Sequence, residues 1–183
     1  TAALAFGGLA TTHRAETESW NGSSWTEVGD LNTARYNPGE AGTSTAALAT
    51  GGNVPPNNAT AVTESWDGTS WTEVADLNSA REGFGGLGTY TSALMAGGGP
   101  SVTGNTELWN GTSWTEDGDL STARYLLAGA GTSTVGLAFG GGAPPIVAVT
   151  EEFAGAGANV GAWSSGGSMN TTRGQGASNG PIT

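Results

Sequence analysis

The sequence contains no cysteine and no lysine, and its single histidine is His13. Without cysteine there is no disulfide framework, no thiolate metal site and no cysteine nucleophile. With one imidazole and no lysine, the side chains that most often serve as general bases or nucleophiles are almost absent. A copper site built from several histidines is excluded for the same reason. We therefore predict a protein that is not an enzyme and that carries no cofactor.

Aliphatic residues are also scarce, because Leu, Ile, Val and Phe together make up only 27 of 183 residues, or 15%. Values below roughly 20% are typical of disordered chains when the net charge is high. Seven Trp and a charged fraction of only 11% argue for a packed core instead. No apolar run approaches the roughly 18 residues of a membrane span, so no membrane insertion is expected. The 33 Gly argue against a helical bundle.

The charge is strongly acidic, with sixteen carboxylates against five basic residues, a net charge of -11 and an isoelectric point near 4.1. Such a surface repels phosphate, so we expect neither nucleic acid nor an anionic membrane as a partner. The chain begins with Thr1 and shows no charged-then-apolar signal segment. We interpret it as a processed product or a piece of a longer polypeptide.

Internal repeats are the strongest signal. A Thr-Glu-x-aromatic motif recurs at spacings of 46, 43 and 44 residues, with its aromatic at Trp20, Trp66, Trp109 and Phe153. A second Trp follows five residues later in three copies, at Trp25, Trp71 and Trp114, whereas the last copy has Trp163. Each copy ends at an Arg, and these are Arg35, Arg81, Arg124 and Arg173. A Gly pair precedes each Thr-Glu motif, at residues 7–8, 51–52, 97–98 and 140–141.

Each copy reads as four short strands, which in the second copy are expected at 36–43, 46–49, 61–66 and 71–74. The last two strands are linked by Asp67-Gly68, and the equivalent dipeptides are Asn21-Gly22 and Asn110-Gly111. These dipeptides favour a two-residue type I′ hairpin turn, in which both residues have positive φ. No stretch has helical periodicity, so we predict an all-β fold. Four strands in about 45 residues are the dimensions of a propeller blade.

The ordered set of a Gly pair, an aromatic, a Trp and Leu-x-x-x-Arg resembles the kelch repeat, over residues 1–173. This resemblance implies β-propeller blades. Four copies with small inner strands favour a four-bladed β-propeller in a single domain of residues 1–183, with blades at 1–35, 36–81, 82–124 and 125–173. The first aromatic is Trp where kelch repeats usually have Tyr, and the fourth copy is eroded. The inner strands carry mostly Gly, Ala and Thr, which suits strands that converge on a narrow axis.

Residues 174–183 take the place of a first strand that the first copy lacks. Each internal Arg precedes the next Gly pair by 16 residues, and joining the two ends of the chain would give 17. Two arrangements satisfy this spacing. The C-terminal strand completes the first blade of its own chain, or it completes that blade in a neighbouring copy.

The repeated side chains have structural and functional interpretations. The Trp rings are expected to pack between blades, and the alternative is an aromatic platform for sugars, for which Trp163 is the candidate. The repeated Arg are expected to bridge blades by pairing with Asp30, Asp76 and Asp119 or with the Glu of each Thr-Glu pair. The alternative for the Arg is an anion-binding ring.

Two further kinds of site were weighed. The acidic segment 116–119 offers oxygen ligands for Ca²⁺, but the first two copies have Val28 and Val74 in place of Asp117, so we predict no metal site. The glycosylation sequon occurs four times, at Asn21, Asn58, Asn110 and Asn170.

These features predict a non-catalytic structural repeat module of an extracellular fibre or filament, on a cell or virion surface. Its expected partners are copies of itself, joined through propeller-propeller contacts. The alternative function is a lectin-like or protein-binding propeller used in adhesion, with carbohydrate as the ligand. The sequence differences among loops 53–60, 100–105 and 143–148 favour this alternative. An enzyme would need one blade with an asymmetric polar cluster, and the fourth copy offers mostly Gly, Ser and Asn.

Overall fold

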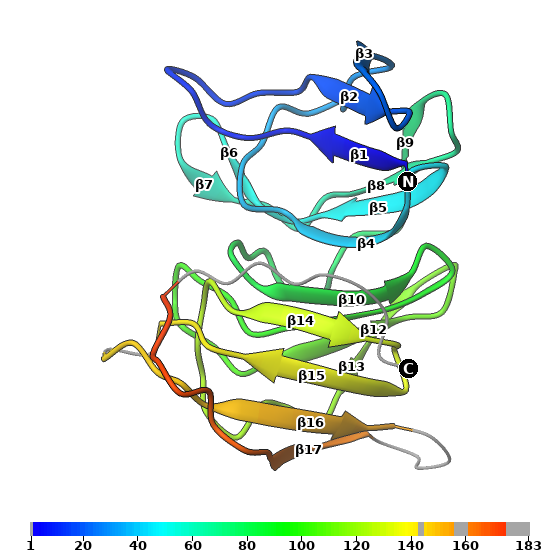
Figure 1. Ribbon diagram of the computed structural model, residues 1–183. Helices are drawn as coiled ribbons and strands as arrows, with labels where there is room; N and C mark the ends of the chain where they lie inside the picture. The colour runs from blue at the N-terminus through cyan, green and yellow to red at the C-terminus, as the bar shows by residue number, and fades with distance from the viewer. Residues whose placement is uncertain (1, 143–144, 156–160, 175–183) are drawn as a thin grey trace.

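The computed structural model of the protein describes residues 2–142, 145–155 and 161–174, and its regular structure there consists of β-strands alone. All paired strands are antiparallel, so the predicted all-β class is confirmed (Figure 1). Over the described residues, no helix has the length and apolar character that crossing a membrane requires.

Each repeat forms one sheet whose strands follow chain order. The first sheet has three strands, β1 (Ala3–Phe6), β2 (Thr17–Trp20) and β3 (Trp25–Glu27). The second has four, β4 (Gly39–Thr43), β5 (Ala46–Thr50), β8 (Thr63–Trp66) and β9 (Trp71–Glu73). The third has β10 (Gly85–Thr89), β11 (Ser92–Ala96), β12 (Thr106–Trp109) and β13 (Trp114–Asp117). The fourth has β14 (Ala128–Gly131), β15 (Val135–Phe139), β16 (Thr150–Ala154) and β17 (Ala162–Ser165). These bounds agree with the strands expected from the second repeat to within a few residues.

One element was not expected. The segment after the second Gly pair, which reads as an irregular Pro-containing loop, forms a small hairpin of β6 (Asn53–Val54) and β7 (Asn58–Ala59). The repeats therefore differ most in the loops that follow the Gly pairs.

The tips of the outer hairpins correct the predicted turn type. Trp66 lies directly opposite Trp71, so four residues connect the strands, and positive φ occurs at Gly68 but not at Asp67. The Asp67 carboxylate accepts hydrogen bonds from the amides of Thr69 and Ser70 at 2.8 and 2.9 Å. The two-residue type I′ turn was wrong, because a side-chain oxygen that satisfies two amides stabilises the wider loop.

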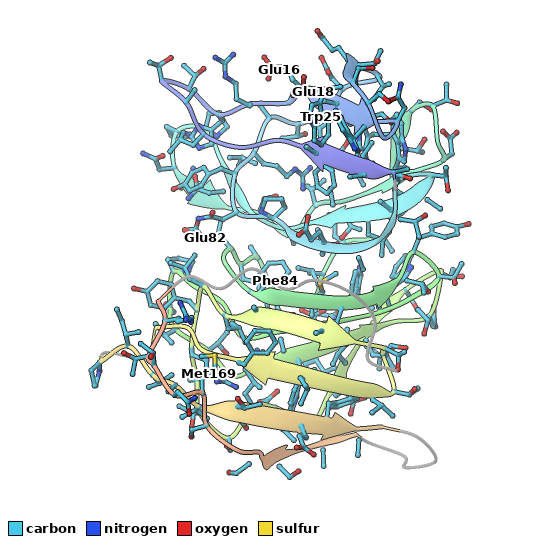
Figure 2. All side chains as sticks on the ribbon, viewed as in Figure 1. Glu16, Glu18, Trp25, Glu82, Phe84 and Met169 are labelled. Atoms are coloured by element: carbon cyan, nitrogen blue, oxygen red, sulfur yellow. The ribbon has the colours of Figure 1, made fainter. Side chains whose placement is uncertain are left out.

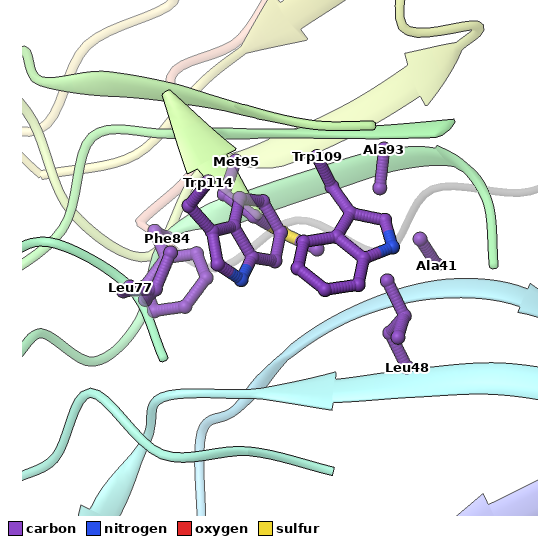
Figure 3. Close-up of a cluster of buried hydrophobic side chains, with 8 residues drawn as sticks. All are labelled: Ala41, Leu48, Leu77, Phe84, Ala93, Met95, Trp109 and Trp114. Atoms are coloured by element: carbon purple, nitrogen blue, oxygen red, sulfur yellow. The ribbon is translucent and has the colours of Figure 1, made fainter. Parts of the chain in front are cut away.

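The core lies between successive sheets. Trp109 and Trp114 of the third sheet point toward Leu48 and Leu77 of the second, with Phe84 beside them (Figure 3). Equivalent clusters join the first sheet to the second and the third to the fourth. The aromatic pairs therefore supply the apolar surface that the scarce aliphatic residues cannot.

The first strands of the sheets converge on a common cavity. Strands β4 and β14 both contact β10, and a Cβ placed on Gly129 would lie 2.8 Å from the Gly86 carbonyl oxygen. Side chains larger than those present would separate the backbones, which explains the small residues of these strands. The cavity, of about 560 Å³, is lined by residues of β1, β4, β10 and β14.

The outer strands β3 and β17 of the first and fourth sheets lie at opposite ends of Figure 1, whereas β1 and β14 both line the central cavity. No hydrophobic cluster of the described residues joins the two sheets. The first sheet has no counterpart of β4, so β1 pairs only with β2 within the described part of the chain. The strand predicted at 174–183 falls, beyond Gly174, outside the described residues.

Candidate functional site

The repeated Arg residues connect each sheet to the next. Arg35, Arg81 and Arg124 end the first three repeats, and their Nη2 atoms lie 2.5, 2.9 and 3.1 Å from the Oε1 atoms of Glu64, Glu107 and Glu151. All six side chains are at most 2% exposed. Each Glu belongs to the Thr-Glu motif of the following repeat. The same buried ion pair therefore occurs at three successive junctions.

The guanidinium also binds the backbone of the following repeat. Arg35 donates from Nη1 to the carbonyl oxygens of Gly51 at 2.9 Å and Val62 at 2.7 Å. Arg81 and Arg124 make the same two bonds, to the corresponding carbonyls of their own following repeats. A planar fork can reach a carboxylate and two carbonyls at once, whereas an ammonium group is a compact point charge. This geometry explains why Arg suits these three positions better than Lys.

Burial lowers the pKa of Arg35, Arg81 and Arg124, and the facing Glu residues oppose this shift. The guanidinium stays charged because its ordinary pKa lies far above neutral pH. A buried charge is costly unless it is paired with an opposite charge. Each junction therefore depends on both members of its ion pair.

The second oxygen of each Glu is held by the segment that precedes the Arg. Oε2 of Glu64 accepts from the Asn32 amide at 2.7 Å and from Asn32 Nδ2 at 2.8 Å. Asn78 does the same for Glu107, and Ser121 does so for Glu151 with its amide and hydroxyl. In each repeat this Asn or Ser stands three residues before the Arg. This fixed spacing is the sequence signal that could have predicted its role.

The repeated Asp residues have a different role from the one considered for them. Asp30, Asp76 and Asp119 accept hydrogen bonds from the amides of Thr17, Thr63 and Thr106 in their own repeats, at 3.1 to 3.2 Å. They close each repeat locally and are not the hydrogen-bonded partners of the Arg. The Arg partners are the Glu residues of the Thr-Glu pairs.

The second Trp of each repeat reaches back to the preceding one. The indole N–H of Trp71 donates to Thr17 Oγ1 at 3.0 Å, and that of Trp114 donates to the Ala75 carbonyl at 3.0 Å. Trp163 of the last repeat donates to Thr106 Oγ1 at 3.1 Å. Each Trp also packs on the first aromatic of its own repeat, with ring centroids 5.1 to 5.5 Å apart.

Two repeated positions are left open by this arrangement. Trp25, in the first repeat, is 49% exposed, whereas Trp71 and Trp114 are 5% and 6% exposed. Arg173, in the last repeat, is exposed, unlike the three preceding Arg. Trp163 was the candidate platform, but it is partly buried and packs against Phe153. The irregular fourth repeat thus still places Trp163 in its junction, as expected for the other Trp residues.

The remaining candidates from the sequence are the acidic metal ligands, His13 and the Asn residues of the sequons. No cluster of His, Cys, Asp or Glu with the arrangement of a metal site occurs in the described ranges. His13 lies 3.0 Å from the Asn53 side-chain oxygen and beside Tyr36. The four sequon residues Asn21, Asn58, Asn110 and Asn170 are all exposed.

A shallow polar and aromatic cavity of about 360 Å³ lies on the loop face. Three repeats contribute to it, with Tyr36, Glu82 and Tyr125 at the position that directly follows each Arg. Pro100 and Val102 come from the loop after the third Gly pair. The sequence indicates variation in the loops that follow the Gly pairs, but no pattern in it marks this cavity.

No protein-family model matches the chain, and no curated protein does so either. Among solved structures, the chain is similar to that of YjhT, with a TM-score of 0.72 and 16% sequence identity over 83% of the chain. The match covers 52% of YjhT, so the chain spans about half the length of that structure. The similarity establishes a shared fold.

Proposed function

We propose that the chain is a non-catalytic structural module made of four kelch-like propeller blades, which assembles with copies of itself. The observation that carries the proposal is the use of the repeated polar side chains. At three successive junctions, Arg, Glu and Asn or Ser bind one another across the sheets. These side chains hold neighbouring repeats together. A structural scaffold needs such contacts.

The propeller arrangement is supported by the position of the first strands. Strands β4, β10 and β14 face a common cavity, as the innermost strands of blades do. The free edge of β1 is the place where a further strand would complete the first blade. We propose that a neighbouring copy completes it, because within the described residues β1 pairs only with β2 and no hydrophobic cluster joins the first sheet to the fourth.

The acidic, cysteine-free and lysine-free composition supports a location on the outside of a cell or virion, in a fibre or filament. Such a net charge keeps a repetitive protein soluble and disfavours contact with nucleic acid. The partners of this module are then further copies of the same chain.

The test is the state of association of the purified protein. Light scattering after size exclusion, from about 1 to 100 µM, is expected to show concentration-dependent growth beyond the 18.1 kDa chain. Negative-stain images are expected to show rings or filaments with a regular repeat. A single 18.1 kDa species at every concentration contradicts the proposal.

A lectin-like function is the second candidate, and the loop-face cavity favours it. Tyr36 and Tyr125 offer ring faces and hydroxyls, and Glu82 offers a carboxylate, which together suit a sugar. A glycan array with wild type and Tyr125→Ala tests it, with Tyr90→Ala as the control because Tyr90 is exposed but lies outside this cavity. Binding that is lost only in Tyr125→Ala supports the lectin function, and an array without signal contradicts it.

A further inference from the structure

The face of the first sheet that carries Glu18, Trp20 and Trp25, here called the leading face, is open to solvent. At the equivalent positions of the second and third sheets, Glu64, Glu107, Trp71 and Trp114 are buried against the preceding repeat. Glu18 is exposed, and no ion-pair partner holds it among the residues described. Figure 2 shows Glu16, Glu18 and Trp25 together at one end of the molecule.

An open cavity of about 420 Å³ lies on the leading face. It is lined by Gly7, Glu16 and Glu18, with Glu27 at its margin. Gly7, Glu16 and Glu18 occupy the positions that bind Arg35 in the second repeat, which are Gly51, Val62 and Glu64. Two carbonyls and one carboxylate are therefore placed as in the three filled junctions. We call this cavity the arginine socket.

The lining charges suit a cation. Glu16 and Glu27 add their carboxylates to that of Glu18, and Arg14 is the single basic residue of the lining. Arg14 forms an exposed ion pair with Glu16, at 3.0 Å, and does not contact Glu18. The carboxylate that would hold a guanidinium thus remains available.

The complementary surface lies on the fourth sheet and carries Leu137, Met169 and Arg173; we call it the trailing face. Leu137 is half-buried, whereas its equivalents Leu48 and Leu94 are completely buried. Met169 is half-buried as well, although Leu residues at its position in the earlier repeats are only 4% to 5% exposed. Arg173 is exposed and has no ion-pair partner within the described ranges.

The leading face therefore carries the accepting residues of a junction, and the trailing face carries the donating residues. Neither set is covered in the described residues. The Arg173 carbonyl accepts a hydrogen bond from the Gly141 amide at 2.8 Å, as the Arg81 carbonyl accepts from Gly52 at 2.9 Å. The backbone that presents the last Arg is thus built like the others. Within the described residues, no following repeat receives the Arg173 side chain.

We propose that Arg173 of one copy fills the arginine socket of a second copy, so that the trailing face of one chain packs on the leading face of the next. This inference rests on the proposed self-assembly and specifies its contacts. Nη2 of Arg173 binds the Glu18 carboxylate, and Nη1 binds the carbonyls of Gly7 and Glu16. Asn170 binds the second Glu18 oxygen, as Asn32 binds Glu64 within the chain.

A second copy is the occupant because the two faces are complementary in charge and continue an interface that the chain already makes three times. No ion pair joins Arg173 to Glu18 among the described residues of one chain, and Figure 2 places Glu18 near the top of the molecule and Met169 in its lower half. The contact is head-to-tail, so it produces a ring where the rotation between copies closes and a filament where it does not.

The experiment uses Arg173→Ala and Glu18→Ala, each of which damages a different face. Each variant alone is expected to remain monomeric, with self-association weakened by about 100-fold or more, because one charge of a buried pair is left without its partner. An equimolar mixture is expected to form dimers and no larger species, since one intact trailing face and one intact leading face remain. Thr112→Ala, at an exposed hairpin tip, is the control and is expected to associate like wild type.

Trp25 gives a second measurement, because its exposed indole is expected to become buried on assembly and its fluorescence to shift to shorter wavelength. Sedimentation and near-ultraviolet circular dichroism of each variant establish that the monomers are folded. If wild type assembles and both variants assemble equally well, the socket is overturned while the proposed self-assembly stands. If wild type is monomeric, Arg173→Ala and Glu18→Ala are also combined in one chain and unfolded with urea. If the double variant loses less stability than the sum of the two single losses, the pair forms within one chain and the second copy is overturned. If wild type is monomeric and the variants show no such coupling, the proposed function fails as well.

Discussion

The guanidinium of Arg81 donates to Glu107 at 2.9 Å across the junction of the second and third sheets, and both side chains are 2% exposed. The two residues are 26 positions apart and belong to different repeats. The pair is repeated by Arg35 with Glu64 and by Arg124 with Glu151. It is the central contact of the fold and the first target for mutation.

Replacing Arg81 by Met keeps the aliphatic stem but leaves the Glu107 carboxylate buried without its partner. We expect the free energy of unfolding to fall by about 3–5 kcal/mol, measured by urea titration. Arg81→Lys is expected to fall between wild type and Arg81→Met, because an ammonium cannot form the same fork. Arg14→Met removes the exposed pair with Glu16 and should change stability by less than about 1 kcal/mol. Equal losses at Arg14 and Arg81 would contradict this account.

Removal of the junction Trp side chains should have unequal effects. Trp114→Ala removes a ring that is 6% exposed and is expected to cost about 3–5 kcal/mol. Trp25→Ala removes the equivalent ring from the leading face, where 49% of it is exposed, and should cost about 1 kcal/mol or less in dilute protein. Thermal or urea unfolding at low concentration compares the two variants. A larger loss for Trp25→Ala would show that the leading face is covered within one chain.

The first glycine of each Gly pair is expected to resist substitution. Gly97 has a φ of +76°, and a Cβ there would lie 2.5 Å from the Arg124 carbonyl oxygen. Gly97→Ala is therefore expected to cost at least about 1–3 kcal/mol, because strain and crowding act together. Gly167→Ala is the control, since open space surrounds that position. Urea titrations of the two variants should differ clearly, and similar midpoints would argue against the close approach.

Stability should also depend on the protonation of Glu40, which lines the central cavity. Partial desolvation by the surrounding cavity wall raises the pKa of Glu40, although the residue is exposed to water, so the folded state binds this proton more tightly than the unfolded chain does. The resulting stabilisation is present below the unfolded pKa, near 4.3, and is lost as the pH rises through the folded value. Glu40→Gln should therefore melt at a higher temperature than wild type at pH 7, and the difference should shrink near pH 3. The effect should be small because the side chain keeps contact with water. A lower melting temperature of Glu40→Gln at pH 7 would contradict the prediction.

The repeat period was sufficient to predict the all-β class and most strand positions, because Gly pairs and turn residues mark the strand ends. The identity of the Arg partner required the structure. Asp30 is closer to Arg35 in sequence than Glu64 is, yet Asp30 binds the Thr17 amide while Glu64 meets the guanidinium from the next sheet. Sequence proximity favours local partners, whereas a stack of sheets brings together residues one period apart.

The hairpin tips and Trp163 also show that local sequence alone does not determine the geometry. The dipeptide Asp67-Gly68 has the residues of a two-residue turn, but the pairing of Trp66 with Trp71 fixes a loop of four residues. Trp163 stands ten residues after Phe153 instead of five, so its motif looks degenerate, yet its ring occupies the junction with the third sheet. In both cases the cross-strand aromatic pair determined the geometry, and the local residues adapted to it.

The bonding scheme has a consequence for how such a chain can change in length. The first three repeats donate with their final Arg and the last three accept with their Thr-Glu motif, so the three internal boundaries have the same chemistry. A duplication or deletion of about 45 residues, begun at any point in the period, restores a matched donor and acceptor at the new boundary. A gene of this kind can therefore gain or lose whole repeats by unequal recombination without having to evolve a new interface.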